Sequence, residues 1–137
     1  MSTRETNQKA LYEVGMPIRR AVLGDDYVNN ALARGSTEFA RAMQEFTTAF
    51  CWGAIWDRPG LDRKQRSLIN LSMLAATGKI HEFAVHTRGA VNNGLSKTEI
   101  REVLVQIVSI WVSRLGWRPS RLVRRCWRQW RRRVQIK

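Results

Sequence analysis

The sequence predicts an all-α fold, a bundle of about six helices. Three observations lead to this prediction. Apolar residues recur three and four positions apart along most of the chain, and no convincing strand-like alternation is seen. Good capping residues stand where these segments begin, and glycine stands where several of them end. The chain has only three prolines, so long helices are permitted.

Two helical segments are predicted at the N-terminus. The first spans residues 7–23, and Gly15 and Pro17 interrupt it, which predicts a kink or two short helices. Residues 24–26 form a turn, and the short helix after it ends near Gly35. The residues that carry the apolar spacing are Leu11, Val14, Ile18 and Val22 in the first segment and Tyr27, Ala31 and Leu32 in the second.

A third helix begins after Ser36, which is a favourable N-cap residue. This helix has one apolar face and leads into residues 51–56. The Asp-Arg-Pro-Gly sequence of residues 57–60 then predicts a turn. The predicted apolar face consists of Phe39, Met43, Phe46, Ala49 and Phe50.

A fourth helix is predicted from the cap residue Asp62 to about Thr77, and Gly78 ends it as a C′ glycine. One set of its residues is expected to be mostly buried. These residues are Leu68, Ile69, Leu71, Ser72 and Leu74 to Ala76.

Two more helices complete the predicted bundle. One covers residues 80–92 and is stopped by Asn93 and Gly94. The other opens with a capping box, in which Ser96 caps the backbone and Glu99 reaches back to it. Its core face is expected to use Ile100, Val103, Leu104 and Ile107.

The net charge of +13 is typical of a nucleic-acid-binding protein, but it is unevenly distributed. Residues 1–113 hold 14 Lys and Arg and 11 Asp and Glu, a net charge of +3. Residues 114–137 hold nine Arg, one Lys and no acid, a net charge of +10. The charge therefore belongs to a tail, and the domain itself is not expected to bind nucleic acid.

Targeting and redox signals favour a cytoplasmic protein. Cys51 and Cys126 are far apart, and neither belongs to a CxxC pair, so a disulfide framework is not expected. The chain has no run of 18 uncharged apolar residues and no secretory signal at its start, so no membrane span is expected.

Residues with catalytic or binding chemistry cluster between positions 52 and 94. Glu82 and His86 are four residues apart and share one helix face, where the carboxylate would orient the imidazole and raise its pKa for acid–base work. The simpler interpretation is a solvated surface pair, exposed arginines and core tryptophans. The other candidates in this region are Trp52, Trp56, Arg58, Arg66, His81 and Arg88.

Two stretches of this region resemble the signature motifs of one enzyme family. Residues 52–68 (WGAIWDRPGLDRKQRSL) and 81–94 (HEFAVHTRGAVNNG) are similar, in order and separation, to the motifs of the carboxymuconolactone decarboxylase family. Residues 96–106 are similar to the helix that follows them, so the resemblance covers about residues 10–108. It implies an alkylhydroperoxidase D-like helical fold, usually assembled as a homo-hexamer, with a role in aromatic catabolism.

The sequence departs from the peroxidases that share this fold. Those relatives carry a CxxC pair and a downstream histidine, and the motif places Lys79 and Glu82 at the two thiol positions and His86 at the histidine. Because the thiolate is the nucleophile in that chemistry, its loss argues against a peroxidase. An alkylhydroperoxidase D-like enzyme acting on another substrate remains an alternative.

The resemblance implies a decarboxylation that needs neither a metal nor a cofactor. When CO2 leaves 4-carboxymuconolactone, the electron pair moves through the C=C bond onto the lactone carbonyl oxygen, and protonation of carbon gives 3-oxoadipate enol-lactone. Arg58, Arg66 and Arg88 are expected to bind the two carboxylates. His86, oriented by Glu82, is expected to donate the proton. Trp52 and Trp56 are candidate pocket walls, and His81 is a second acid or a structural residue.

The resemblance ends abruptly near Val108, which divides the chain into a domain of residues 1–108 and an atypical tail of residues 109–137. A set of codons chosen for residues 111–120, shifted by one base, encodes Gly-Val-Pro-Ala-Gly-Val-Glu-Ala-Phe, which resembles the family's continuation. A frameshift near codon 108 is therefore the preferred explanation, and a genuine basic tail is the alternative. Because the tail takes the place of the family's last helix, assembly of the hexameric ring is not assured for this chain. The alternative to an enzyme is an inactive family member whose tail binds nucleic acid or anionic membrane.

Overall fold

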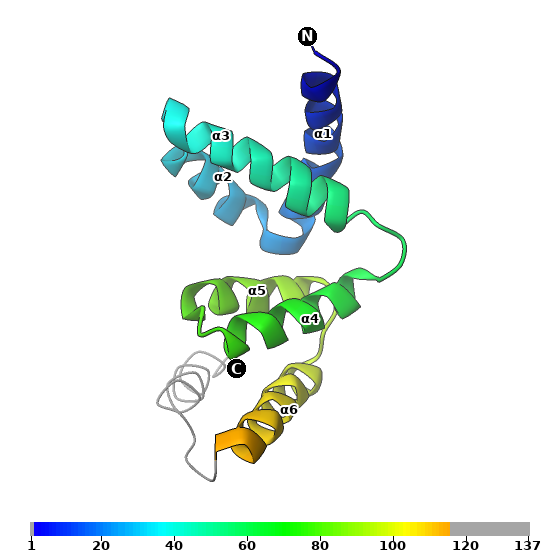
Figure 1. Cartoon of the computed structure of the whole chain (residues 1–137), viewed down its shortest axis with the longest axis vertical. Helices are drawn as coiled ribbons and strands as arrows, with labels where there is room; N and C mark the ends of the chain where they lie inside the picture. The colour runs from blue at the N-terminus through cyan, green and yellow to red at the C-terminus, as the bar shows by residue number, and fades with distance from the viewer. Residues whose placement is uncertain (1, 116–137) are drawn as a thin grey trace. The chain divides into compact units, whose positions relative to one another are not determined.

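The computed structural model describes the backbone of residues 2–115 and the side chains of residues 2–110. Over this range the chain is all-α and contains no strand, which confirms the predicted fold class. Contacts divide the chain into an N-terminal unit that ends at Arg66 and a C-terminal unit that begins at Ser67. The elements in Figure 1 are α1 (Thr3–Leu23), α2 (Asp25–Arg34), α3 (Glu38–Thr47), the π-helix η1 (Thr48–Ile55), α4 (Arg63–Ala76), α5 (Ile80–Asn92) and α6 (Lys97–Leu115).

The N-terminal unit is built around the crossing of α1 and η1, which lies in the region where α1 meets the end of α3 in Figure 1. Two glycines permit this crossing. A Cβ atom on Gly15 would lie 2.6 Å from the backbone nitrogen of Gly53, and one on Gly53 would overlap the carbonyl of Leu11. The two backbones therefore touch. Beside this contact lies a core of Ile18, Val22, Trp52 and Trp56, with Leu23 and Cys51 packed against it.

Helix α1 is continuous through Gly15 and Pro17, so the alternative of two short helices is wrong, and the kink stays a prediction. It also begins earlier than expected, because Ser2 and Glu5 form a capping box. Its buried face differs from the apolar spacing: Leu11 and Val14 are 37% and 43% exposed. The reason is the glycine contact with η1, which turns a different stripe of the helix inward. That stripe consists of Gly15, Ile18, Arg19 and Val22.

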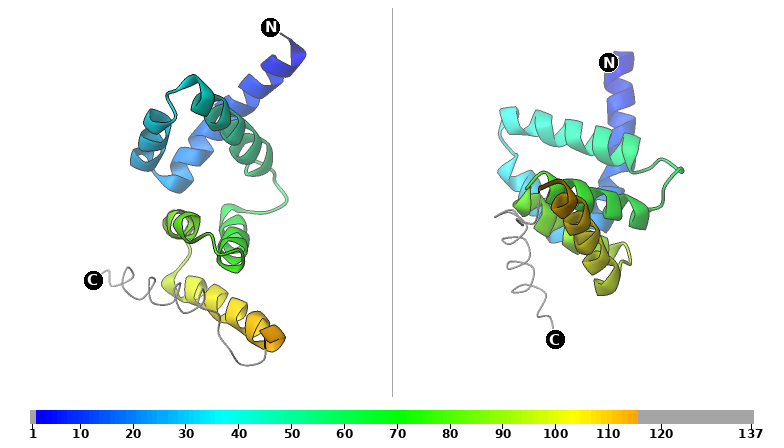
Figure 2. Two further views of the ribbon diagram at one scale, coloured as in Figure 1. Left: turned by 60° about the vertical axis from the view of Figure 1, so that its left-hand side comes forward. Right: turned by 60° about the horizontal axis from the view of Figure 1, so that its bottom comes forward.

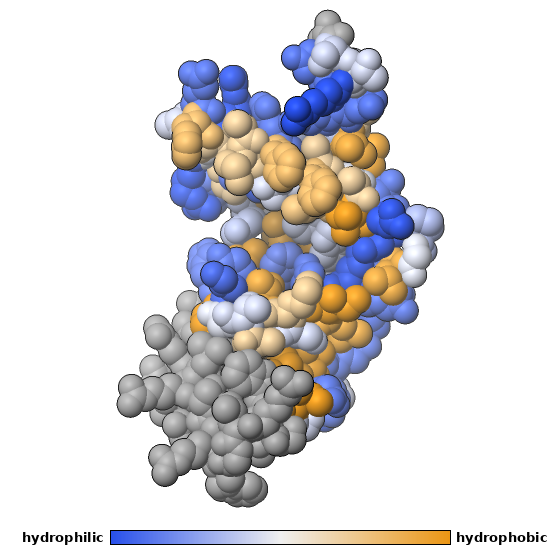
Figure 3. Space-filling model, in the orientation of Figure 1, coloured by the Kyte–Doolittle hydropathy of each residue, from blue (hydrophilic) through white to orange (hydrophobic). Residues whose placement is uncertain are grey.

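Helix α3 begins one residue later than predicted, with Thr37 as its N-cap, whose hydroxyl accepts from the amide of Ala40. Its predicted apolar face exists but is largely exposed in this chain. Phe39 is 89% exposed, and only Ala49, in the following π-helix, is buried. Figure 3 shows the apolar atoms gathered along α3 in the upper part of the view. The exposed members of this face are Phe39, Met43, Phe46 and Phe50.

The π-helix η1 continues directly from α3; it contains Trp52, and Trp56 is the C-cap residue that follows it. Its last turn closes with the amide of Trp56 donating to the carbonyl of Cys51, five residues earlier, at 3.0 Å. This spacing is that of a π-helix, which is rare and often lies at functional sites. This π-helix was not predicted from the sequence.

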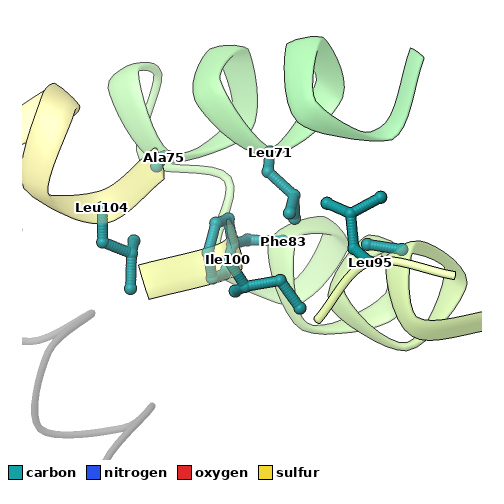
Figure 4. Close-up of a cluster of buried hydrophobic side chains, with 7 residues drawn as sticks. Leu71, Ala75, Phe83, Leu95, Ile100 and Leu104 are labelled. Carbon is teal, nitrogen blue, oxygen red and sulfur yellow. The ribbon is translucent and has the colours of Figure 1, made fainter. Parts of the chain in front are cut away.

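The C-terminal unit contains a single apolar cluster among its described residues. Helices α4 and α5 run side by side in Figures 1 and 2, and α6 contributes the third wall of the cluster shown in Figure 4. Within α4, Leu71 and Ala75 are buried as predicted, but Ile69 is 44% exposed, so its predicted burial is wrong. The buried members are Leu71, Ala75, Phe83, Ala90, Leu95, Ile100 and Leu104.

The predicted ends of the later helices are confirmed. Gly78 and Gly94 have φ angles of 73° and 87°, the left-handed region that favours glycine. In each case the amide of the glycine and the amide of the residue after it donate to carbonyl oxygens in the last turn of the helix, as in a Schellman motif. The capping box is also present, since the amide of Ser96 donates to Glu99 at 2.7 Å and that of Glu99 donates to Ser96 at 3.1 Å.

Helix α6 continues to Leu115, beyond the predicted domain boundary at residue 108. Most of the predicted tail, residues 116–137, lies outside the described residues. Within the described part of the chain, no helix combines the length and apolar character needed to cross a membrane.

Candidate functional site

The predicted site residues fall in both units of the chain. Trp52, Trp56, Arg58 and Arg66 belong to the N-terminal unit. His81, Glu82, His86 and Arg88 belong to the C-terminal unit, where all four lie on α5.

The two tryptophans of the first motif are core residues of the N-terminal unit. Trp52 and Trp56 are 5% and 9% exposed, and their ring centroids lie 4.9 Å apart with the planes tilted by 32°. They pack against Ile18 and Val22 of α1. This placement agrees with the simpler interpretation of both residues, and their role as pocket walls stays a prediction.

The structure brings Arg58 and Arg66 together at the start of α4. A reciprocal cap between Asp62 and Gln65, with bonds of 2.9 and 2.7 Å, fixes this helix start. In the first turn of α4, Nη2 of Arg66 donates to the main-chain carbonyl oxygen of Arg58 at 2.8 Å. Nε of Arg66 is buried and has no partner within the described residues. Arg66 therefore has a buried N–H group that can donate to an additional acceptor, whereas the side chain of Arg58 is exposed.

In the C-terminal unit, Glu82 and His86 share one side of α5, as their spacing predicted. Glu82 is exposed in the first turn, and His86 is half-buried one turn later. Burial lowers the pKa of His86 below its ordinary value, and the nearby Glu82 carboxylate opposes this by raising it. The net direction is opposite to the sequence prediction, because the spacing reveals the carboxylate but not the loss of water around the ring.

His81 and Arg88 lie on a different side of the same helix. Arg88 follows His86 by two residues, about 200° around an α-helix, and His81 precedes Arg88 by seven residues, close to a whole number of turns. Both side chains are exposed. The structure therefore does not place them beside the Glu82–His86 pair on this helix.

Asn93 joins the stripe that carries Glu82 and His86, and the sequence analysis assigned it only a role in ending the helix. Its side-chain nitrogen donates to the hydroxyl of Ser67 at 2.9 Å, and Ser67 is fully buried in α4. This hydrogen bond connects the end of α5 to α4 and so helps to fix the orientation of α5 relative to α4. The sequence signal was the i, i+7 spacing of His86 and Asn93.

Arg19 was also missed by the sequence analysis. It is 5% exposed, and it donates to Thr48 and Gln44 at 2.8 Å each. The signal was its position, because Gly15, Arg19 and Val22 are spaced as residues on one helix face. Burial lowers the pKa of the Arg19 guanidinium and raises that of the neighbouring Cys51 thiol.

The described residues offer no cluster of three His, Cys, Asp or Glu side chains that could bind a metal ion. The candidate site residues instead provide cationic side chains and the Glu82–His86 pair. Arg58 and Arg66 supply N–H donors suited to carboxylates, and the half-buried imidazole beside a carboxylate is suited to proton transfer.

Comparison with known proteins assigns the chain to a family. The carboxymuconolactone decarboxylase family matches residues 41–111. A nitrosuccinic acid decarboxylase from Metarhizium robertsii is 46% identical over 108 residues, which cover 77% of this chain and 75% of that protein. A 4-carboxymuconolactone decarboxylase from Acinetobacter baylyi is 37% identical over 99 residues, which cover 72% of this chain and 73% of that protein. These matches support a carboxy-lyase activity, and they show that the chain belongs to the carboxymuconolactone decarboxylase family.

Proposed function

We propose that this chain decarboxylates a small dicarboxylic acid without a cofactor, and that 4-carboxymuconolactone, an intermediate of protocatechuate catabolism, is its substrate. The observation that carries the proposal is the Glu82–His86 pair on the half-buried side of α5, inside the second family motif. The name of the Acinetobacter relative supports the substrate. We also propose that the enzyme is cytoplasmic and forms a homo-oligomer.

The reaction needs an electron sink, and the substrate supplies one. The bond between the carboxylate carbon and the ring carbon breaks, and CO2 leaves. The electron pair is delocalised through the C=C bond onto the lactone carbonyl oxygen. A proton then adds to the carbon beside that carbonyl, which gives 3-oxoadipate enol-lactone. The protein has to bind two carboxylates, stabilise the developing oxyanion and deliver one proton.

We assign the proton delivery to His86 and its orientation to Glu82. A lowered pKa makes the imidazolium a stronger acid, which speeds proton transfer to carbon, but it reduces the protonated fraction at pH 7. Turnover that depends on this proton should therefore increase as the pH falls from 7 toward the pKa of the imidazole.

Carboxylate binding is assigned to Arg66 and Arg58. The unpartnered Nε of Arg66 is the supporting observation, because a buried N–H without an acceptor is costly and a substrate carboxylate would satisfy it. Arg88 is a weaker candidate, since it lies on another side of α5 from His86.

Nitrosuccinate is a second candidate substrate, favoured by the 46% identity with the Metarhizium enzyme of that name. It is also a dicarboxylic acid, and its nitro group provides the electron sink. Loss of CO2 from the carbon that bears the nitro group leaves a nitronate, which takes up a proton on carbon. As with the lactone, the protein has to bind two carboxylates and deliver one proton.

The test is turnover of both acids by the purified chain, followed by substrate absorbance and CO2 release. We expect wild-type turnover of one of them, and its loss in His86→Gln with the helical circular dichroism unchanged. The matched control is Thr87→Ala, which alters a neighbouring α5 residue whose hydroxyl only bonds the carbonyl of Phe83 within the helix. Near-normal turnover in His86→Gln would show that His86 is not the proton donor. If wild type turns over neither acid, the proposed substrates are wrong.

A further inference from the structure

Among the described residues, Arg19 is a buried cation without an anionic partner. Its side chain lies on the inward face of α1 and is 5% exposed. A guanidinium remains charged in proteins, so burial removes its hydration without neutralising it. Such a charge is normally paired with a carboxylate when it is buried.

The observed partners of Arg19 are neutral. Nη1 donates to Thr48 Oγ1 and Nη2 donates to Gln44 Oε1, both at 2.8 Å, while Nε is buried and has no partner among the described residues. The adjacent Arg20 provides a contrast, because it is partly exposed and forms a 2.8 Å ion pair with Asp25. The structure therefore leaves Arg19 with an unsatisfied donor and an unbalanced charge.

No anionic side chain of the described residues pairs with Arg19. Besides burial, the charged groups that act on its pKa are Tyr27, Tyr12, Arg20 and Cys51, and none of them is an Asp or Glu. Thr48 accepts from Arg19 and keeps its own hydroxyl proton to donate. A buried cation that is held by a hydroxyl and an amide oxygen, with one N–H donor left over, is the composition expected of an anion site.

We propose that Arg19 is the cationic centre of a binding site for a small carboxylate, with Thr48 as a neutral donor. One guanidinium matches the single charge of a carboxylate, and its buried Nε–H can donate to a carboxylate oxygen. Phosphate is less suited, because the neighbouring cation Arg20 is already paired with Asp25. Since Nε is shielded from solvent, binding requires a side chain around Arg19 to move.

The experiment measures carboxylate binding by the full chain. Thermal unfolding is followed with increasing sodium acetate or sodium succinate, against sodium chloride at the same ionic strength. A ligand that binds only the folded state raises the unfolding temperature as its concentration increases. We expect carboxylate-specific stabilisation in wild type, retained in Arg20→Gln and weakened about tenfold or more in apparent affinity in Arg19→Gln.

Arg20→Gln is the matched control because it removes the same charge from the next position of the same helix. If Arg19→Gln does not fold, Thr48→Val takes its place, and it should weaken binding severalfold by removing one donor. Equal effects of chloride and carboxylate on wild type, equal losses in both arginine variants, or full retention in Arg19→Gln would each overturn the proposal. None of these outcomes depends on turnover, so the decarboxylase proposal is tested separately.

Discussion

His86 is a single imidazole on which two environments act in opposite directions. Loss of water around the half-buried ring lowers its pKa, and the Glu82 carboxylate raises it, with burial the larger effect. A folded-state pKa below that of the unfolded chain means that the unfolded chain binds more protons in the interval between the two values. Protonation therefore favours unfolding in that interval.

Stability should fall when the wild-type chain is acidified. Above an unfolded pKa of about 6.5 the full contribution of His86 is present, and it is lost as the pH falls from there through the lower folded-state pKa. The measurement is the urea midpoint of unfolding at several pH values between about 7.5 and 5. In His86→Gln this part of the pH dependence should disappear.

His81→Gln is the matched control, because His81 is the other histidine of the same helix and is exposed. This variant should keep the wild-type loss of stability on acidification. A wild-type midpoint that rises between pH 6.5 and 5, or an unchanged profile in His86→Gln, would show that burial does not control this imidazole.

Single residues were predicted well where local spacing determines them. The i, i+4 relation of Glu82 and His86 is a property of the helix, so the sequence was sufficient to find it. Their pKa balance and the burial of Arg19 depend on what packs over them, which one sequence does not state. His81 and Arg88 were grouped with His86 by proximity in the chain, although helical geometry alone separates them.

At the scale of elements, the crossing of α1 and η1 depends on two missing side chains. A methyl group on Gly53 would overlap the Leu11 carbonyl, and one on Gly15 would meet the backbone of η1 itself. Neither obstacle is a side chain that can rotate away. The helices would have to separate, which would also loosen the tryptophan core beside them.

Gly53→Ala should therefore destabilise the chain by about 1–3 kcal/mol, the usual range for overpacking a close contact, or by more. Urea unfolding followed by tryptophan fluorescence gives the change in free energy. Gly60→Ala is the matched control, since a Cβ atom there would meet nothing within 4 Å and the residue is exposed. It should change stability by less than about 0.5 kcal/mol. Similar effects in both variants would contradict the close-contact explanation.

Helix ends were more predictable than helix faces. Gly78, Gly94 and the Ser96–Glu99 box act through hydrogen bonds within a few residues, so their sequence signal is complete. Which side of a helix is buried depends on its neighbour. For α1 the neighbour is η1, which selected the glycine stripe in place of the one with Leu11 and Val14. The π-helix had no sequence signal in the apolar spacing.

At the scale of the whole molecule, the positive charge and the family motifs occupy different parts of the sequence. The motifs lie within residues 52–94, where acids and bases are mixed, and the excess charge follows residue 113. The motifs identified the family directly, because two long stretches in the right order are far more specific than a composition. Substrate identity was not determined in this way, since relatives with the same motifs are named for different acids.

This charge division predicts that any DNA binding is nonspecific and belongs to the tail. The full chain should shift duplex DNA at low salt, with affinity falling by orders of magnitude between about 50 and 200 mM salt. A chain that ends at Leu115 should not shift it. Gel shifts at several salt concentrations test this, and a parallel assay should show decarboxylation unchanged by added DNA. DNA binding that persists in the shortened chain would contradict the assignment of DNA binding to the tail.

The π-helix also has an evolutionary consequence. Each residue advances an α-helix by about 100°, so deleting one residue between Thr48 and Trp52 would rotate both Gly53 and Trp56 by about that amount relative to α3. The tryptophan would then leave α1, and Gly53 would no longer face Leu11. Homologues that keep this crossing should therefore conserve the length of the segment even where its side chains vary.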